Sequence, residues 1–62
     1  MVFNKGQLVV WINECGEDEL GIVVIQYDNC DTEVMFAGGY QSLVDGWDVK
    51  EGFLIPLEEI CK

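Results

Sequence analysis

The most constraining feature of this sequence is a pair of strongly apolar runs, at 20–27 and 32–37, separated only by the polar segment 28–31. Both runs contain β-branched and aromatic residues, which favours strands over helices. The Asp and Asn residues between them tolerate the left-handed backbone that a tight strand connection requires. We therefore predict a β-hairpin whose first strand, apolar on both faces, lies at the centre of its sheet.

Three further short strands are predicted, at 7–12, 40–44 and 53–55. Sixty-two residues form one domain at most, so residues 1–62 are treated as a single unit. Five short strands at close spacing leave edges and an uncovered face if the sheet stays open. We therefore expect an all-β fold in which antiparallel strands roll up into a small, strongly bent barrel.

Local signals mark where this pattern changes. Gly21 indicates a bulge or a close backbone approach near the start of the central strand. Asp45 and Gly46 form a turn signal, and the segment after them is irregular. Pro56 and the carboxylates behind it predict one 3₁₀ turn over 56–59, with Ile60 and Cys61 packing against the first strand.

Four short motifs follow one another along the chain: GQLVVW (6–11), LGIVV (20–24), TEVMF (32–36) and IPLEEI (55–60). Together they resemble the small stand-alone SH3-like β-barrel proteins of bacteriophage and bacterial genomes. In that family an opening strand G-D-x-V-x-W/V precedes a G-x-V hairpin, and a P-x-x-x-L/I tail closes the barrel. The resemblance implies fold more than function. Gln7 replaces the usual acidic residue, and 40–52 is longer and less regular than the family pattern.

Charge narrows the range of partners. Twelve acidic residues against three lysines and no arginine give a net charge of −9. Nucleic-acid binding depends on cationic groups that displace counterions from phosphates, so direct binding to DNA or RNA is not expected. A protein partner with a basic surface would be attracted by this charge. The alternative is that the charge only keeps a half-apolar chain in solution.

Location and metal content follow from the apolar runs and the cysteines. No run approaches the roughly 20 apolar residues that span a bilayer, so no membrane association is expected. The first residues do not form a secretory signal. Cys15, Cys30 and Cys61 are odd in number and form no CxxC pair, which indicates reduced thiols in a cytoplasm, that of a bacterial cell or a phage-infected host. Without histidine they supply no typical zinc site.

Catalysis has few candidate groups in this chain. There is no histidine or arginine, the only hydroxyls of the Ser/Thr type are Thr32 and Ser42, and no glycine-rich phosphate loop precedes a helix. We therefore expect neither an enzyme nor a cofactor. Asp28, Asp31 and Glu33 offer carboxylates for a calcium loop, but their spacing does not match an EF-hand, and ordinary hairpin chemistry accounts for them.

Trp11 lies within the predicted strand 7–12, where alternation with Val9 favours an interior position over a binding one. The other side of this strand, with Leu8, Val10 and Ile12, is also apolar. If the C-terminal tail leaves it uncovered, it is a surface for a partner or for a second copy of the chain. A core of this size supplies only about 3 to 5 kcal/mol, so a homo-oligomer is a further expectation.

Two other aromatic residues are candidates for recognition. Trp47 lies beside a turn between Asp45 and Asp48, and Tyr40 follows two glycines. An exposed indole at such a place provides a large, rigid anchor for a partner, although packing against the core explains it equally well.

The segment 14–19 is acidic and joins the first two predicted strands. SH3-like barrels carry their long specificity loop at this position, so the resemblance implies that its carboxylates flank an aromatic groove and select partners bearing Lys or Arg. Solvation of a loop that prevents aggregation is the alternative. The candidate partner-binding residues are Glu14, Glu17, Asp18, Glu19, Tyr40, Trp47 and Asp48.

Three hypotheses for function remain open at this point. The first is a non-enzymatic adaptor or inhibitor that docks a basic or proline-containing protein surface, including that of a phage host. The second is a nucleic-acid mimic whose carboxylates imitate phosphates and block a DNA- or RNA-binding protein. The third is an oligomer that sequesters a small molecule or nucleotide, which the surplus negative charge disfavours for anionic ligands.

Overall fold

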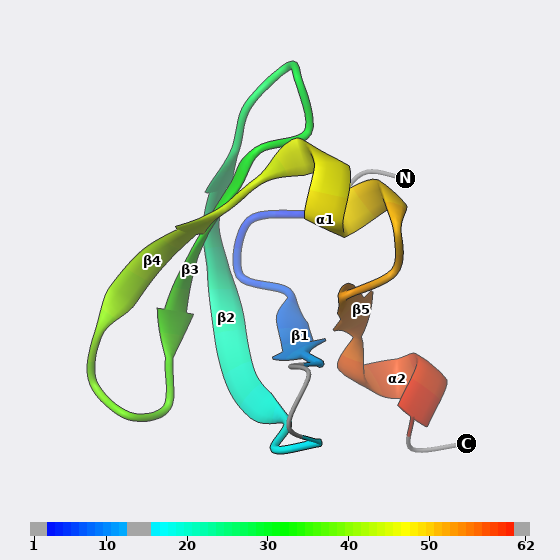
Figure 1. Cartoon of the computed structure of the whole chain (residues 1–62). Coiled ribbons are helices and arrows are strands. Elements are labelled where there is room, and N and C mark those ends of the chain that lie inside the picture. The colour runs from blue at the N-terminus through cyan, green and yellow to red at the C-terminus, as the bar shows by residue number, and fades with distance from the viewer. Residues whose placement is uncertain (1–2, 13–15, 61–62) are drawn as a thin grey trace.

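The computed structural model describes residues 3–12 and 16–60, of which the side chains of 59 and 60 are not described. Its elements, in chain order, are β1 (Leu8–Trp11), β2 (Glu19–Gln26), β3 (Thr32–Phe36), β4 (Gln41–Val44), α1 (Gly46–Lys50), β5 (Leu54–Pro56) and α2 (Leu57–Ile60). Figure 1 shows α1 between the end of β4 and the start of β5, with α2 following β5 directly. All five predicted strands are present, with bounds that differ by at most one residue.

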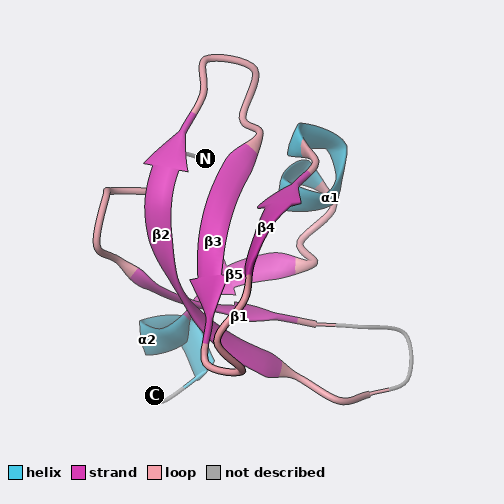
Figure 2. Ribbon diagram, turned by 90° about the vertical axis from the view of Figure 1, so that its left-hand side faces the viewer, coloured by secondary structure: helices cyan, strands magenta, loops and turns pink. Residues whose placement is uncertain are grey.

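The strands form one sheet in the order β4-β3-β2-β1-β5, and every neighbouring pair is antiparallel. The long strand β2 is central, as predicted, and it pairs with β3 on one side and with β1 on the other. Figure 2 shows that β2 is strongly curved. The all-β prediction is therefore confirmed. Among the described residues no pairing joins β4 to β5, so the sheet has two edges and the predicted closed barrel is not confirmed.

The β2–β3 connection is a tight hairpin, but the residue with the left-handed backbone is Cys30, whose φ is 74°. The N–H of Cys30 donates to the carbonyl of Tyr27 at 3.0 Å, and the N–H of Tyr27 donates to Asp31 at 2.8 Å. This is the geometry of a turn followed by one left-handed residue. The prediction that Asp or Asn takes that conformation was wrong, because Asn29 and Asp31 use their side chains to hold the loop and the α1 terminus.

The segment predicted to be irregular after Asp45 begins with the short helix α1, which is a correction. Asp45 is its N-cap, because Asp45 Oδ1 accepts a hydrogen bond from the N–H of Trp47 at 2.9 Å. Asp followed by Gly is as typical of a turn as of a helix start. A helix of five residues is too short to show a 3.6-residue apolar period.

The C-terminal turn is helical as predicted, but it is the α-helical turn α2 rather than a 3₁₀ turn. Pro56 ends β5 and lies opposite Val9 in β1, a place at the sheet edge where its missing N–H costs no ladder bond. The expected packing of Ile60 and Cys61 against β1 lies outside the described side chains.

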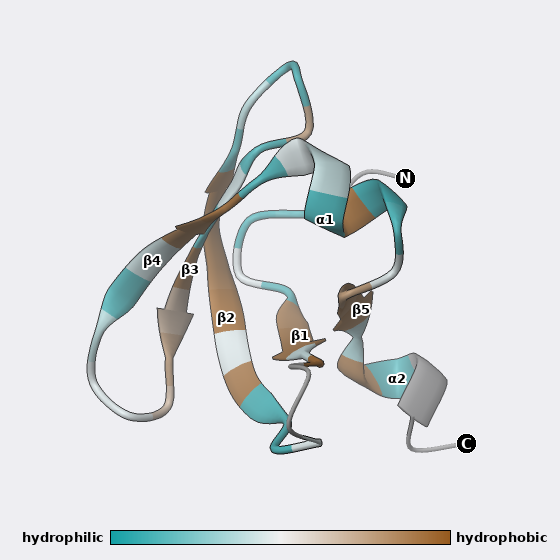
Figure 3. Cartoon of the chain, in the orientation of Figure 1, coloured by the Kyte–Doolittle hydropathy of each residue, from teal (hydrophilic) through white to brown (hydrophobic). Residues whose placement is uncertain are grey.

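The core is a cluster on the inner face of the sheet, and its centre consists of Val9, Val23, Val34 and Leu54, all at most 2% exposed. Gly21 is required here for close approach, because a Cβ at this position would lie 2.4 Å from Val34 Cγ1. The sheet irregularity falls between Val23 and Ile25 rather than at Gly21. Figure 3 shows the apolar residues concentrated along the strands, whereas the connections are mainly hydrophilic.

None of the helices in the described part of the chain has the length and apolar character needed to cross a membrane.

Candidate functional site

The structure gathers three of the predicted site residues around one groove of about 230 Å³: Glu19, Tyr40 and Asp48. Glu17 and Asp18 are exposed in the loop before β2, outside the groove lining, and Glu14 lies outside the described residues. Trp47 is 63% exposed on α1 and does not line the groove. The described residues that line this groove, called the acidic–aromatic groove below, are Trp11, Glu19, Phe36, Tyr40, Ser42, Leu43, Val44 and Asp48.

One wall of the acidic–aromatic groove consists of stacked aromatic rings at the β3–β4 turn. The rings of Phe36 and Tyr40 lie 5.2 Å apart between centroids with an interplanar angle of 29°. The N–H of Phe36 donates to the carbonyl of Tyr40 at 2.8 Å, and Gly39 takes a left-handed φ of 90° that completes the reversal. Phe36 is buried, so this wall is anchored in the core.

Strands β1 and β2 contribute Trp11 and Glu19, which are cross-strand partners. Trp11 is half-buried against the core, and its indole lies 6.3 Å from the ring of Phe53 in a tilted arrangement. The predicted interior position of Trp11 is therefore only partly correct, because its side chain also lines the groove.

Glu19 and Tyr40 are joined directly, because the phenol O–H of Tyr40 donates a hydrogen bond to Glu19 Oε2. This bond, with smaller contributions from burial and from the negative charge of Glu19, raises the pKa of Tyr40 above its ordinary value. The contact joins β2, through Glu19, to the β3–β4 turn, through Tyr40. It also leaves the second carboxylate oxygen of Glu19 as an acceptor for another group.

Asp48 reaches the groove because α1 is fastened to the β2–β3 hairpin. The backbone N–H of Gly46 donates to Asp31 Oδ1 at 2.6 Å, and Asn29 Oδ1 in turn accepts from the N–H of Asp31 at 3.1 Å. Gly46 is required, since a Cβ there would lie 2.3 Å from the carbonyl oxygen of Asn29. Val49 packs into the core and fixes the rotation of the helix.

The chemistry of the acidic–aromatic groove is that of an acceptor site. Its polar groups are two carboxylates, a phenol, a hydroxyl and the indole N–H of Trp11, and none of the described lysines lines it. Such a lining favours donors and cations, whose charge also interacts well with the faces of aromatic rings.

Five lining residues were missed by sequence reasoning as site residues: Trp11, Phe36, Ser42, Leu43 and Val44. One available signal was the hairpin register, which places Trp11 opposite Glu19 once β1 and β2 are paired. The residues of β3 and β4 gave no such signal, because apolar strand residues are expected in a core.

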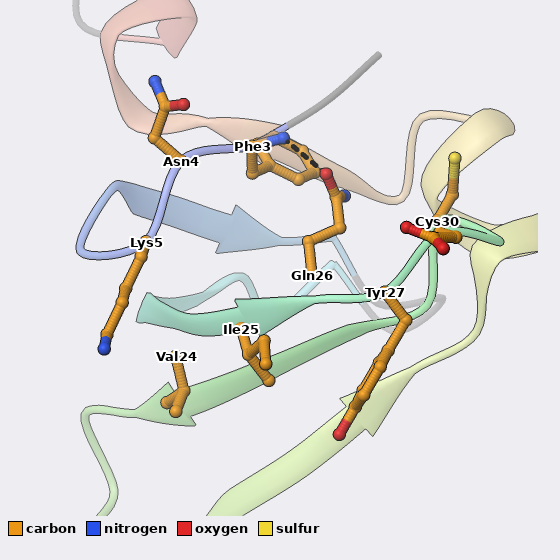
Figure 4. A pocket seen from close by; sticks show the side chains of 9 residues that line it. Phe3, Asn4, Lys5, Val24, Ile25, Gln26, Tyr27 and Cys30 are labelled. Atoms are coloured by element: carbon orange, nitrogen blue, oxygen red, sulfur yellow. Dashed lines mark hydrogen bonds between the residues drawn. The ribbon is translucent and has the colours of Figure 1, made fainter.

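A larger hollow of about 450 Å³ lies between the N-terminal segment and the β2–β3 hairpin, and Figure 4 shows its side chains. Gln26 spans it, accepting from the N–H of Phe3 at 2.8 Å and donating to Thr32 Oγ1 at 2.9 Å. The fully buried Thr32 hydroxyl donates to the carbonyl of Cys30 at 3.0 Å. These bonds fasten the N-terminal segment to the sheet, and none of the predicted site residues lies here.

Within the described ranges, His, Cys, Asp and Glu side chains form no group of three suited to a metal ion, and Cys30 is a free thiol. No family model matches the chain, and neither the curated proteins nor the solved structures include a significant match.

Proposed function

We propose that this chain is a non-enzymatic protein-interaction module whose acidic–aromatic groove binds a basic segment of a protein partner. The observation that carries the proposal is the meeting of Glu19, Tyr40 and Asp48, from three separate parts of the chain, in one groove that no lysine of the described residues lines. An adaptor or an inhibitor of a host protein would use such a site in the same way.

Charge and ring chemistry support a Lys- or Arg-bearing ligand. Glu19 and Asp48 are both half-buried, so a cation between them is less screened than at an open surface. The ring of Tyr40, 45% exposed and held in place by Phe36, offers a face for a cation or a proline. The net charge of −9 adds long-range attraction that speeds encounter with a basic partner.

We also infer that the fold is an SH3-like barrel variant. Support comes from the strand order β4-β3-β2-β1-β5, from the short helix between β4 and β5, and from the position of the groove beside the β1–β2 connection. A groove flanked by this connection is what the sequence resemblance implies.

The proposal is tested by selecting ligands from a library of displayed random peptides. We expect the selected peptides to be enriched in Lys or Arg beside proline or aliphatic residues. Tyr40→Ala and Asp48→Asn should each weaken their binding about tenfold or more, the loss expected for a central anchor. Glu58→Gln is the matched control, because it removes one negative charge from an exposed residue outside the groove.

Selection without Lys or Arg enrichment, or equal binding by Asp48→Asn and Glu58→Gln, would contradict the proposal. Nucleic-acid mimicry predicts a different result. The chain would capture a DNA-binding protein, DNA would displace the chain from it, and the affinity would fall steeply with salt. Asp48→Asn and Glu58→Gln would then weaken binding equally.

A further inference from the structure

The outer edge of β4 has main-chain groups that no other described strand pairs with. β4 pairs only with β3 in the order of the described strands, and Figure 2 shows it at one side of the sheet. The N–H of Phe36 donates to the carbonyl of Tyr40 at 2.8 Å, and hydrogen-bonded and non-hydrogen-bonded pairs alternate along an antiparallel ladder. Gln41 and Leu43 therefore direct their N–H and C=O groups away from β3, where one further strand can pair with them.

The edge of β4 separates two acidic hollows on opposite faces of the sheet. On the core side, Ser42 and Val44 line the acidic–aromatic groove, and Val44 is buried in the core. On the other side, Glu33 and Leu43 are cross-strand partners, so their side chains share the face opposite to Val44. They line a second hollow of about 560 Å³ beside the β2–β3 loop. The described residues that line it, called the hairpin hollow below, are Tyr27, Asp28, Asn29, Asp31, Glu33 and Leu43.

Negative charge flanks this edge on both faces. Two carboxylates line the acidic–aromatic groove and three line the hairpin hollow, and none of the described lysines lines either. Asp31 accepts from the backbone N–H of Gly46 and from the side-chain amide of Asn29. Glu33 accepts from the side-chain amide of Gln41. All three donors are neutral, so these charges remain for a cation to balance. Charge complementarity therefore selects a segment with Lys or Arg on both of its sides.

We propose that the basic segment of the partner binds as an added β-strand along the edge of β4, with its side chains entering the acidic–aromatic groove and the hairpin hollow in turn. This inference rests on the proposed function and adds the conformation of the partner and a second basic position. Successive side chains of a strand point to opposite faces, so neighbouring residues of the segment reach different hollows. Strand addition to an exposed edge uses main-chain hydrogen bonds for affinity and alternate side chains for specificity.

The edge defines the class of partner. The segment is an unstructured chain terminus or linker, because the main-chain groups of a helix or of a sheet interior are already paired. It needs about four residues to span Gln41–Val44. One basic residue enters the acidic–aromatic groove, and a basic residue adjacent to it in sequence enters the hairpin hollow. The residue that pairs with Leu43 must have an N–H, so proline is excluded at that position.

The main-chain hydrogen bonds are tested with the tightest-binding peptide from the library selection. Its backbone nitrogens are methylated one residue at a time, which removes each N–H without changing a side chain. We expect an alternating pattern, in which methylation at every second residue weakens binding about tenfold or more and the residues between tolerate it. Equal effects at all positions, or no effect at any, would overturn the proposal.

Amide hydrogen exchange of the full chain gives a second readout that needs no variant. At saturation with the unmethylated peptide, the amide of Leu43 should exchange about tenfold more slowly or less, because it gains a strand partner. The amide of Glu58 is the control, since Glu58 is exposed and lies outside both hollows. Unchanged exchange at Leu43 with the peptide bound would contradict strand addition.

The hairpin hollow is tested separately with Glu33→Gln, which keeps an acceptor for Gln41 and removes the charge. It should weaken peptide binding about threefold, the loss of one partly exposed ion pair, whereas Glu58→Gln should not. Equal binding by these two variants would overturn the role of the hairpin hollow. A peptide that needs Asp48 but shows neither the alternating pattern nor protection at Leu43 would leave the proposed function standing and this inference overturned. If no basic peptide is selected, both fail.

Discussion

At the scale of single residues, the groove depends on a few side chains that each perform two tasks. Tyr40 stacks on Phe36 and also donates to Glu19, so the same ring forms a wall and fixes a carboxylate. Asp31 holds the hairpin loop through Asn29 and, on its other oxygen, the N–H of Gly46. Residues that connect two elements in this way transmit a local substitution to the whole groove.

The first prediction concerns Tyr40. Its raised pKa means that the folded state holds the phenol proton more tightly than the unfolded state, mainly through Glu19. The stabilisation is therefore complete below the ordinary tyrosine pKa of about 10 and is lost as pH rises through the higher folded value. Ultraviolet titration should show the Tyr40 midpoint falling in Glu19→Gln. An unchanged midpoint would show that the hydrogen bond does not form in solution.

At the scale of elements, the position of α1 decides whether the groove has a second acidic side. The helix has five residues and contributes only Val49 to the core cluster, so its placement depends on its N-terminus. That terminus is set by the Asp45 cap and by the contact of Gly46 with the hairpin. The loop of the β2–β3 hairpin and the helix are separated by β3 and β4 in sequence but are held together by this contact.

The second prediction concerns Gly46→Ala. The added Cβ would meet the backbone oxygen of Asn29 at 2.3 Å, so the helix must shift and the free energy of unfolding should fall by about 1–3 kcal/mol. Gly38→Ala is the control, because its Cβ would meet only the Tyr40 ring, at 3.2 Å, and should cost less. Urea denaturation measures both. Equal costs would mean that α1 is not fixed by this contact.

At the scale of the whole molecule, the sheet has an open edge at β4, beside the acidic–aromatic groove. β4 pairs only with β3 in the described structure, and the groove opens beside it. Phe36 donates to the carbonyl of Tyr40, so the alternate residues Gln41 and Leu43 direct their backbone groups away from β3. These groups meet solvent in an open sheet and would be paired in a closed barrel.

The third prediction uses this difference. Amide hydrogen exchange should be fast at Leu43 and slow at Val34 in the neighbouring strand, because only an amide bonded within the sheet is protected. Nuclear magnetic resonance measures the exchange of each amide separately. Strong protection at Leu43 would show that β4 has a further partner, either β5 through barrel closure or another chain.

The number of strands, the hairpin between 20–27 and 32–37 and the central place of 20–27 could be predicted from the sequence because they depend on local signals. The run 20–27 is apolar on both faces, which requires a central strand, and Asp, Asn and Gly residues mark the reversals. Glu19 was assigned to a site from the acidity of 14–19 and the family resemblance, and Tyr40 from its place after two glycines. Their hydrogen bond, across 21 positions in sequence, had no local signal.

The sequence by itself determined that this chain forms a small antiparallel β-sheet with an acidic exterior, since periodicity, turn residues and net charge are properties of neighbouring positions. Only the tertiary structure decided that Asp48 lines one groove with Glu19 and Tyr40, that Trp47 lies outside that groove, and that β4 is an edge strand. These outcomes depend on the contact of Gly46 with the hairpin loop and on the curvature of the sheet. Both are set by packing between segments far apart in the chain.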